Sequence, residues 1–468
     1  MMRRRRARVF VPVFLLLVGL VLVQVALPAV AVAEDAVPTY ETTRLRVYYP
    51  LYLLSGNYVF PVDYIVPAIE SDDPAAVAEA ALNQLIAGPP EKPFRMMLTI
   101  PKETEVLSVT VEDNVATVDF SSEIQSLNVG SGGESAILTA IVNTVCQYPI
   151  SSVRLLVEGN EVESLAGHVD ITGVLEPDFS AQIQPMEDVG QHWAGGSTIL
   201  LQAMDIVAGF DDDTFRPDEK VTRAQFVKLL VEACELPGPG ETSMPFADVE
   251  NHWAKWHVQS AIAAEIISPE DYGTSFKPDE VISREEMAQI LVKASDIYRE
   301  DHPEISFAEP LEDRDFTDLA EIQDKYLESA LESARRGLIK GYPDGSFGPK
   351  NGLTRGEAVT VIARMMEVSG DRVILSTPRP GYQRGDNDVF VVGAATAFEA
   401  NVNFRLTAED SSEAMYSYTT ATSGMGWGMF GICVKAEVLE NLNAHELEIH
   451  LVSPKDGEEY SKVTVPLG

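Results

Sequence analysis

FRPDEKVTRAQ (215–225), FKPDEVISREE (276–286) and FGPKNGLTRGE (347–357) are three versions of one pattern within a single chain. Each begins with Phe-x-Pro, and an arginine stands six residues after the proline. A pattern that recurs with fixed internal spacing indicates a structural repeat and constrains the architecture more than any single local signal does. The chain is therefore predicted to contain three copies of one folding unit.

A helix-capping box occurs at the same place in each copy. The pattern is serine or threonine followed three residues later by glutamate or glutamine, and both side chains accept hydrogen bonds from backbone N–H groups of a first helical turn. Three helices are therefore expected to begin at these boxes, which are Thr222 with Gln225, Ser283 with Glu286, and Thr354 with Glu357.

An arginine takes the first helical position after each cap, at Arg223, Arg284 and Arg355. A cation there faces the positive end of the helix dipole, which is the unfavourable end. Because the arrangement occurs three times, we infer that each arginine serves something outside its own helix. Free helix N–H groups beside a guanidinium form a site for an anion.

One face of each capped helix is apolar at the spacing of an α-helix, which indicates a core rather than a cofactor site. A single helix pair cannot bury such a face alone, so the three copies are expected to pack on one another. The apolar positions are Phe226, Leu229, Leu230 and Ala233; Met287, Ile290, Leu291 and Ala294; and Ala358, Val361, Ile362 and Met365.

Other elements of the pattern recur as well. Each copy opens with aspartate and an apolar residue, at 188–189, 248–249 and 318–319, and the first two continue into His-Trp-Ala. The loops before two of the capped helices read GFDDDTF (209–215) and GYPDGSF (341–347). With these motifs in fixed order, residues 187–370 resemble three tandem S-layer homology (SLH) domains.

The resemblance implies a function and a set of binding residues. The SLH family binds secondary cell wall polysaccharide non-covalently, typically through pyruvylated or otherwise acidic sugars that lie in grooves between repeats. The residues that it implies for polysaccharide binding are Arg223, Arg284, Arg355, Gly209, Asp212, Gly341, Asp344, Trp193 and Trp253.

Two departures from the family pattern bear on these grooves. The second copy reads SPEDYGTSF (268–276) and lacks the Gly-x-x-Asp loop, and the third has Gln323 where the others have tryptophan. One or two grooves are therefore expected to be weak or silent, with Arg284 contributing less than Arg223 and Arg355.

The segment before the repeats mixes strands with helices. A hairpin is expected around Asn114, and helices are expected to end before prolines. This order of elements indicates an α+β domain. The expected strands are 45–52, 106–113, 115–122 and 153–159, and the expected helices are 74–88 and 134–149.

VATVDFSSE, ESAILTAIVNTV and VRLLVEGNEVESLAGHVDITGVLEPD resemble the GerM-type (GerMN) domain of sporulation and spore germination proteins. The resemblance covers 43–178 and implies a non-catalytic assembly or scaffolding module. His168 is the one residue there that suggests catalysis. It has no nucleophile or ligand partner in the pattern, so we interpret it as structural.

Short strands separated by turns follow the repeats, which predicts an all-β sandwich. GAATAFEANVNFRL, together with HLVSPKDGEEYSKVTVPL near the end, resembles the immunoglobulin-like domain that closes many bacterial spore germination proteins. That resemblance implies an interaction module, in which Glu399 is a structural acid.

The composition excludes some functions. Lys and Arg number 35 against 72 Asp and Glu, a net charge of −37, which repels nucleic acid and anionic lipid. Cys146, Cys234 and Cys433 are scattered, without disulfide or metal spacing, and are expected to be buried. No cofactor, metal ligand set or catalytic residue is predicted.

The predicted architecture is therefore multidomain. It comprises an α+β GerM-type domain, an all-α module of three SLH repeats and a C-terminal all-β immunoglobulin-like sandwich. The expected boundaries are 1–33 for a signal peptide, 43–178 for the GerM-type domain, 187–236, 246–298 and 315–369 for the SLH repeats, and 376–468 for the immunoglobulin-like domain.

The leading hypothesis is a non-catalytic protein on the surface or wall of a Gram-positive-type bacterium. It would bind wall polysaccharide, with sporulation or envelope proteins as further partners. An SLH-anchored wall enzyme is the alternative, although no paired-carboxylate, Ser-His or metal-ligand constellation supports it. A calcium-binding adhesin is suggested by the acidic run 211–213, but that run lacks the spaced ligands and distal glutamate of a calcium loop.

The N-terminus predicts export. Basic residues 3–8 precede an apolar run that ends in Ala31-Val32-Ala33, a small-x-small cleavage site. N-terminal sequencing of the surface-associated protein is expected to begin at Glu34. A mature chain that keeps its N-terminal arginines would instead indicate a membrane anchor, since the run is long enough to span a bilayer.

Overall fold

The computed structural model describes residues 40–467, apart from 54–55, 70–72, 92–93, 95–96, 148, 304–315, 368–371, 379–386, 409–412 and 425. The expected signal segment and most of the acidic linker before the third repeat lie outside the described residues. No helix in the described ranges has the length and apolar character needed to cross a bilayer.

The N-terminal unit begins with a long antiparallel hairpin of β1 (Thr42–Leu53) and β2 (Gly56–Pro67). A second, three-stranded sheet pairs β3 with β4 antiparallel and β4 with β5 parallel. Helix α2 makes the crossover between β4 and β5, as a parallel pair requires. The remaining elements are α1 (Pro74–Ala87), β3 (Val106–Glu112), β4 (Val115–Phe120), α2 (Ser131–Val145) and β5 (Ser152–Val157).

Glu134 on helix α2 holds the segment that follows β5 in place. Its carboxylate is fully buried and accepts four backbone N–H bonds, two on each oxygen, from Leu165, Ala166, His168 and Val169. His168 therefore contributes its backbone to a buried anion nest, while its side chain points to solvent. This geometry agrees with a structural interpretation of the AGHVD motif.

The repeat module consists of helix pairs, one for each repeat. The capped helices begin at Arg223, Arg284 and Arg355, as the capping boxes predict. The pairs are α3 (Gly195–Ala203) with α4 (Arg223–Ala233), α5 (Lys255–Ala263) with α6 (Arg284–Asp301), and α7 (Asp324–Arg335) with α8 (Arg355–Met365).

The C-terminal unit is mainly β, with one short helix, α9 (Ala436–Asn441), between two strands. Its four-stranded sheet has the order β12-β11-β8-β9. The strands are β6 (Val373–Thr377), β7 (Val389–Thr396), β8 (Asn401–Ala408), β9 (Glu413–Thr420), β10 (Trp427–Val434), β11 (Ala444–Val452) and β12 (Glu459–Pro466).

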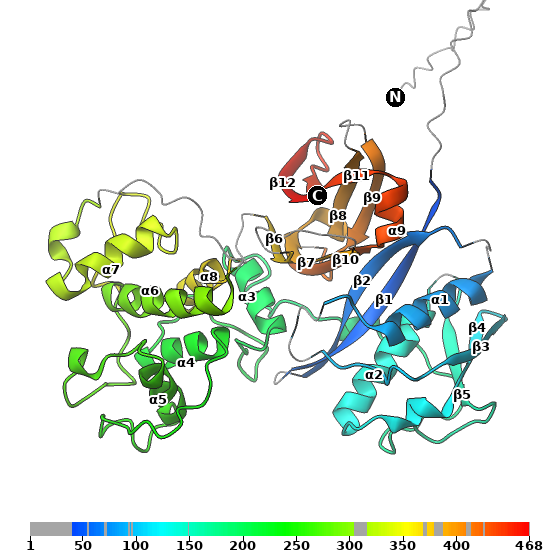
Figure 1. Cartoon of the computed structure of the whole chain (residues 1–468), viewed down its shortest axis with the longest axis horizontal. Helices are drawn as coiled ribbons and strands as arrows, with labels where there is room; N and C mark the ends of the chain where they lie inside the picture. Colours follow the sequence, from blue (N-terminus) through cyan, green and yellow to red (C-terminus); the bar gives the residue numbers. More distant parts are fainter. Residues whose placement is uncertain are drawn as a thin grey trace, which may run out of the picture. The chain divides into compact units, whose positions relative to one another are not determined.

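The opposing sheet is shared between the two ends of the chain. Its strand order is β1-β2-β10-β7-β6 (Figure 1). Strand β2 pairs in parallel with β10, with Asp63 opposite Ile432. Separate sheets were expected from the sequence, with no strand over 56–67. Strand β2 was not predicted because it contains Pro61 and Pro67, and proline is unusual inside a paired strand.

Asp63 on β2 connects the two sheets. Its side chain is buried, accepts hydrogen bonds from Arg46 Nε (2.8 Å) and Nη2 (2.6 Å), and accepts a third from the hydroxyl of Thr419 on β9 (2.8 Å). A buried carboxylate is tolerated because all three donors compensate for its lost hydration. The N-terminal hairpin and the C-terminal sandwich therefore share a core and a polar link.

Helix α3 packs on this shared sheet through two glycines. A Cβ atom at Gly195 would lie 2.5 Å from the ring of Trp427, and one at Gly196 would lie 2.6 Å from it. The Trp427 backbone N–H also donates to the carbonyl of Gly190 (2.9 Å). The first repeat has Gly-Gly where the second has Lys255-Trp256, so the contact with β10 is specific to the first repeat.

Replacing Asp63 is expected to loosen the shared sheet. Asp63→Ala should lower the free energy of unfolding by about 2–3 kcal/mol, less than for a fully buried pair because the Arg46 side chain keeps 23% exposure. Thr419→Val keeps the ion pair and should cost only about 1 kcal/mol. Urea unfolding of the three proteins measures both values, and equal losses would contradict a role for the ion pair.

Candidate functional site

The three repeats close into a ring of backbone hydrogen bonds. The N–H of Val221 donates to Leu353 (2.9 Å), that of Leu353 to Ile282 (3.2 Å), and that of Ile282 back to Val221 (3.2 Å). These residues directly precede the three helix caps. Each repeat therefore holds both others, and the third repeat contacts the first as the second contacts the third.

The aspartate that opens each repeat fixes the Phe-x-Pro turn. Asp188 accepts the backbone N–H groups of Phe215 (2.8 Å) and Arg216 (2.6 Å). Asp248 and Asp318 bind the corresponding pairs in the second and third repeats. In each turn the two N–H groups before the proline are adjacent, and the two oxygens of one carboxylate accept both of them.

Two of the three capping boxes are complete. Thr222 with Gln225 and Thr354 with Glu357 make both reciprocal hydrogen bonds. Ser283 accepts the N–H of Glu286, but the Glu286 carboxylate binds Arg223 and the hydroxyl of Tyr272 instead. The glutamate of the second box is therefore used between repeats.

Arg223 of the first repeat reaches into the second. It donates from Nε (2.5 Å) and Nη2 (2.9 Å) to Glu286, and from Nη1 to the carbonyls of Phe276 and Lys277 (both 2.7 Å). The arginine is 8% exposed and the glutamate 4%. This buried, bidentate ion pair explains why an arginine occupies the N-terminus of helix α4, where the helix dipole disfavours a cation.

Arg284 repeats the arrangement between the second and third repeats. Its guanidinium lies 3.5 Å from Glu357 and 4.8 Å from the centre of the Tyr342 ring. Its Nε is buried without a hydrogen-bond partner. This ion pair is therefore longer and less complete than that of Arg223.

Arg355 closes the cycle onto the first repeat, where the equivalent of the glutamate is the neutral Gln225. It donates to the carbonyl of Phe215 (2.7 Å) and lies 4.4 Å from the centre of that ring. Burial lowers its pKa. Among the described residues Arg355 has no ion pair, and it lines a cavity of about 140 Å³ with Gln225 and Lys228.

The predicted loop residues support the turns. Asp212 accepts the N–H (3.3 Å) and hydroxyl (2.5 Å) of Thr214, and Asp344 makes the same bonds with Ser346 (3.0 and 2.7 Å). Hydrogen bonds to neighbouring hydroxyls lower the pKa of both exposed carboxylates. The loop glycines are sterically required, since a Cβ at Gly209 would meet Met186 Sδ at 2.7 Å and one at Gly341 would meet Phe316 at 2.7 Å.

The predicted tryptophans lie on the surface. Trp193 is 59% exposed and Trp253 is 55% exposed. Trp193 borders a groove of about 540 Å³ between the first and third repeats, with Lys220 and Thr354 among its other walls. The structure therefore brings Trp193 and the cap of Arg355 to neighbouring positions, while Trp253 and Arg223 do not share a groove with them.

Sequence reasoning missed Lys220, Lys228 and Lys350. Lys220 donates to the carbonyl of Gly352 (2.6 Å), and Lys350 to Glu285 (2.5 Å), which also accepts both nitrogens of Gln323. Lys350 could have been noticed in the sequence, because the residue after Phe-x-Pro is an aspartate in the first two repeats, Asp218 and Asp279, and a lysine in the third. Gln323, which replaces tryptophan, thus forms part of a polar contact between the second and third repeats.

The prediction that the cysteines are buried is confirmed. The three cysteines are free and buried, and burial raises the pKa of Cys234 to about 12. Glu399 occupies a left-handed backbone conformation with φ of 51°.

Family models match each part of this architecture. Residues 47–163 match Germane, described as sporulation and spore germination, and 372–458 match Gmad2, an immunoglobulin-like domain of bacterial spore germination. The S-layer homology domain matches 185–227, 245–288 and 315–359. The chain carries one GerMN domain, three SLH repeats and one Gmad2 domain.

Similar curated proteins overlap this chain in part. A cellulosome-anchoring protein of Acetivibrio thermocellus is 30% identical over 39% of this chain and 39% of its own length. An S-layer protein of Bacillus thuringiensis subsp. finitimus is 27% identical over 26% of this chain and 15% of its own. An amylopullulanase of Thermoanaerobacterium thermosulfurigenes is 27% identical over 46% of this chain, and the chain spans 11% of its length.

Solved structures overlap it in part as well. The first GerMN domain of the sporulation protein GerM from Bacillus subtilis is 25% identical and covers 29% of this chain and 98% of its own, with a TM-score of 0.24. The tandem GerMN domains of the same protein are 26% identical and cover 29% of this chain and 46% of theirs, also with a TM-score of 0.24.

Glu286→Gln is expected to destabilise the SLH module. It leaves the buried guanidinium of Arg223 without its counter-charge, which should cost about 3 kcal/mol. Glu250→Gln removes a partner of the exposed Lys255 and should cost less than about 0.5 kcal/mol. A thermal melt compares the variants, and indistinguishable melting temperatures would show that the buried pair does not hold the repeats.

Proposed function

We propose that this chain is a non-catalytic cell-surface protein held on an acidic secondary cell wall polysaccharide by an all-helical module of three SLH repeats. The GerMN and Gmad2 domains are presented from that anchor, in sporulation or germination. The similarity to a cellulosome-anchoring protein and an S-layer protein supports anchoring at the cell surface. The family descriptions of the two outer domains support the germination setting.

The observation that carries the proposal is the asymmetry among the three arginines. Arg223 and Arg284 have glutamate partners in the next repeat, whereas Arg355 faces Gln225 and has no ion pair in the described part of the chain. Glu219 and Asp188 act on Arg355 from beyond ion-pair distance, and an anionic ligand in direct contact would stabilise the partly buried guanidinium further through charge-assisted hydrogen bonds. The region of Arg355 and Trp193 is thus the leading binding site.

The cavity beside Arg355 is lined mainly by apolar side chains together with Arg355, Lys228 and Gln225, and it has room for a small acidic substituent. Its volume of about 140 Å³ is too small for a sugar ring with its neighbours, and Lys228 supplies a second cation. The larger groove beside Trp193, at about 540 Å³, has room for the sugar itself. In this proposal Arg223, Arg284 and their loops build the scaffold, and their own grooves bind polysaccharide more weakly.

The enzyme alternative has less support. Proteins named amylopullulanase and endoglucanase are similar to this chain, but the chain spans only 11% and 19% of their lengths. The families matched here include no catalytic domain. Release of sugars or peptides from purified wall by the protein would favour the enzyme alternative over the anchor.

A pair of substitutions tests the Arg355 site. Arg355→Gln should weaken binding to purified sacculi by about tenfold or more, since one charge-assisted hydrogen bond is lost. Gln225→Glu keeps the capping box but supplies the carboxylate that Arg355 lacks. It should weaken binding similarly while the melting temperature holds or rises, because the new ion pair competes with the ligand.

The control is Arg154→Gln, an exposed arginine of the GerMN domain that pairs with Glu161. It changes the net charge by the same amount as Arg355→Gln and should leave sacculus binding unchanged. Unaltered affinity in both Arg355→Gln and Gln225→Glu would rule out this site. Extraction of polysaccharide from the sacculi should abolish binding of the unmodified chain.

A further inference from the structure

A second cavity, away from the Arg355 cavity, lies where the SLH module meets the Gmad2 domain. Its volume is about 640 Å³, within the range of ligand-binding pockets. The SLH module contributes the Gly190–Trp193 turn, Ser197, Lys340, Thr360 and Arg364, and the Gmad2 domain contributes Arg372, Ile374, Thr396 and Trp427.

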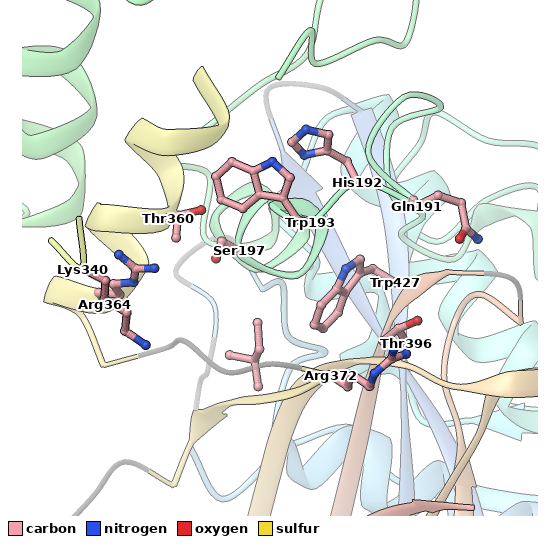
Figure 2. Close-up of a pocket in the computed structure, with 12 residues that line it drawn as sticks. Gln191, His192, Trp193, Ser197, Lys340, Thr360, Arg364, Arg372, Thr396 and Trp427 are labelled. Atoms are coloured by element: carbon pink, nitrogen blue, oxygen red, sulfur yellow. The ribbon is translucent and has the colours of Figure 1, made fainter. Parts of the chain in front are cut away.

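The charge of this cavity departs from that of the chain. Acidic residues outnumber basic ones 72 to 35 overall. Yet, of the residues that the structure describes, the lining holds Lys340, Arg364 and Arg372 and no aspartate or glutamate. Figure 2 shows Arg364 and Lys340 together on one side, with Trp427 and Arg372 across from them. Cations converge here from both the SLH module and the Gmad2 domain.

The two arginines lack counter-charges within the described residues. Arg364 on α8 donates to the carbonyl of Leu338 (3.0 Å), and burial together with the nearby Arg284 lowers its pKa. Arg372 is exposed and lies 5.9 Å from the centre of the Tyr460 ring. Neither arginine has an ion pair among these residues, so two guanidinium groups face one cavity without a paired carboxylate. An anion bound between them would supply the missing counter-charge.

Two indole rings complete the lining. Trp193 is 59% exposed, and Trp427 is 5% exposed and held in place by its contact with Gly195 and Gly196. The exposed indole of Trp193 offers a flat apolar face beside a polar N–H edge, which suits the face of a sugar ring, whereas the buried Trp427 contributes only a small part of its ring to the lining. Cations and indoles together favour a sugar with an acidic substituent over a bare inorganic ion.

We propose that this interdomain cavity is a further binding site for an anionic glycan segment, with the acidic group between Arg364 and Arg372 and a sugar ring against Trp193, which also borders the groove of the proposed wall-binding site. The acidic group is a carboxylate or a phosphate. The ligand class rests on the proposed wall-binding function, but the site does not, since Arg372 and three further lining residues belong to the Gmad2 domain. A bound glycan here bridges the anchor and the presented domain.

Calorimetric titration of the full chain with digalacturonate, at low salt so that screening is weak, tests the site. Arg372→Gln should weaken the affinity by about tenfold or more, and Arg154→Gln, which makes the same change of charge in the GerMN domain, should not. Arg372 is exposed, so its replacement leaves the core intact. Thr396→Glu adds a carboxylate to the lining and should weaken binding by a similar factor.

A parallel titration with glucose 6-phosphate distinguishes the acidic group. A loss of about tenfold in Arg372→Gln for either probe supports the site, and the probe that shows it identifies carboxylate or phosphate. Equal affinities of Arg372→Gln and Arg154→Gln for both probes would overturn the proposal. So would binding of neutral lactose as tight as that of digalacturonate.

Sacculus pelleting separates this inference from the proposed function. A chain that fails to pellet with sacculi, yet binds digalacturonate through Arg372, loses the wall-anchoring proposal and keeps this site. A chain that pellets through Arg355, with probe binding that is insensitive to Arg372→Gln and Thr396→Glu, keeps the anchor and loses this site.

Discussion

Three backbone hydrogen bonds, joining Val221, Leu353 and Ile282 in a closed cycle, are the constraint on which the SLH module depends. A cycle of this kind leaves no terminal repeat, because each repeat both donates to one neighbour and accepts from the other. It also brings the three helix caps to one place, so that each arginine beyond a cap points into the adjoining repeat. The Phe-x-Pro turns, held by Asp188, Asp248 and Asp318, set the position of each donor.

Near-threefold geometry makes small sequence differences functionally important. The position after each cap presents an arginine to the next repeat, where the third residue of the capped helix is Glu286, Glu357 or Gln225. Where glutamate stands, the charge is neutralised inside the protein, as at the 2.5 Å contact of Arg223. Where glutamine stands, the described residues supply no ion pair to the arginine, and the proposed ligand would take that place. One amide in place of one carboxylate therefore separates a structural contact from a candidate binding site.

Much of this could be read from the sequence, and the exceptions have physical causes. The capping boxes predicted where α4, α6 and α8 begin, because caps depend on local hydrogen bonds alone. The partners of the arginines could not be predicted, since Arg223 and Glu286 are 63 residues apart and meet only through the ring. Without these partners, the sequence set Arg284 apart from the other two arginines because its repeat lacks the Gly-x-x-Asp loop. The structure instead sets Arg355 apart, because no carboxylate of the next repeat pairs with it. The pairing of β2 with β10 joins residues more than 350 positions apart, beyond the reach of any local pattern.

The shared sheet also determines how the anchor is attached. The chain enters the SLH module through Gln182 and Ile183, which bridge to Val59 on β2, and leaves it through β6, which pairs with β7 of the same sheet. The SLH module is therefore inserted between two segments that both pair with strands of the same sheet. Under the proposed anchoring to the wall, tension on the SLH module would divide over two strands of one sheet instead of acting on a single linker, which would restrict rotation of the GerMN and Gmad2 domains about the anchor.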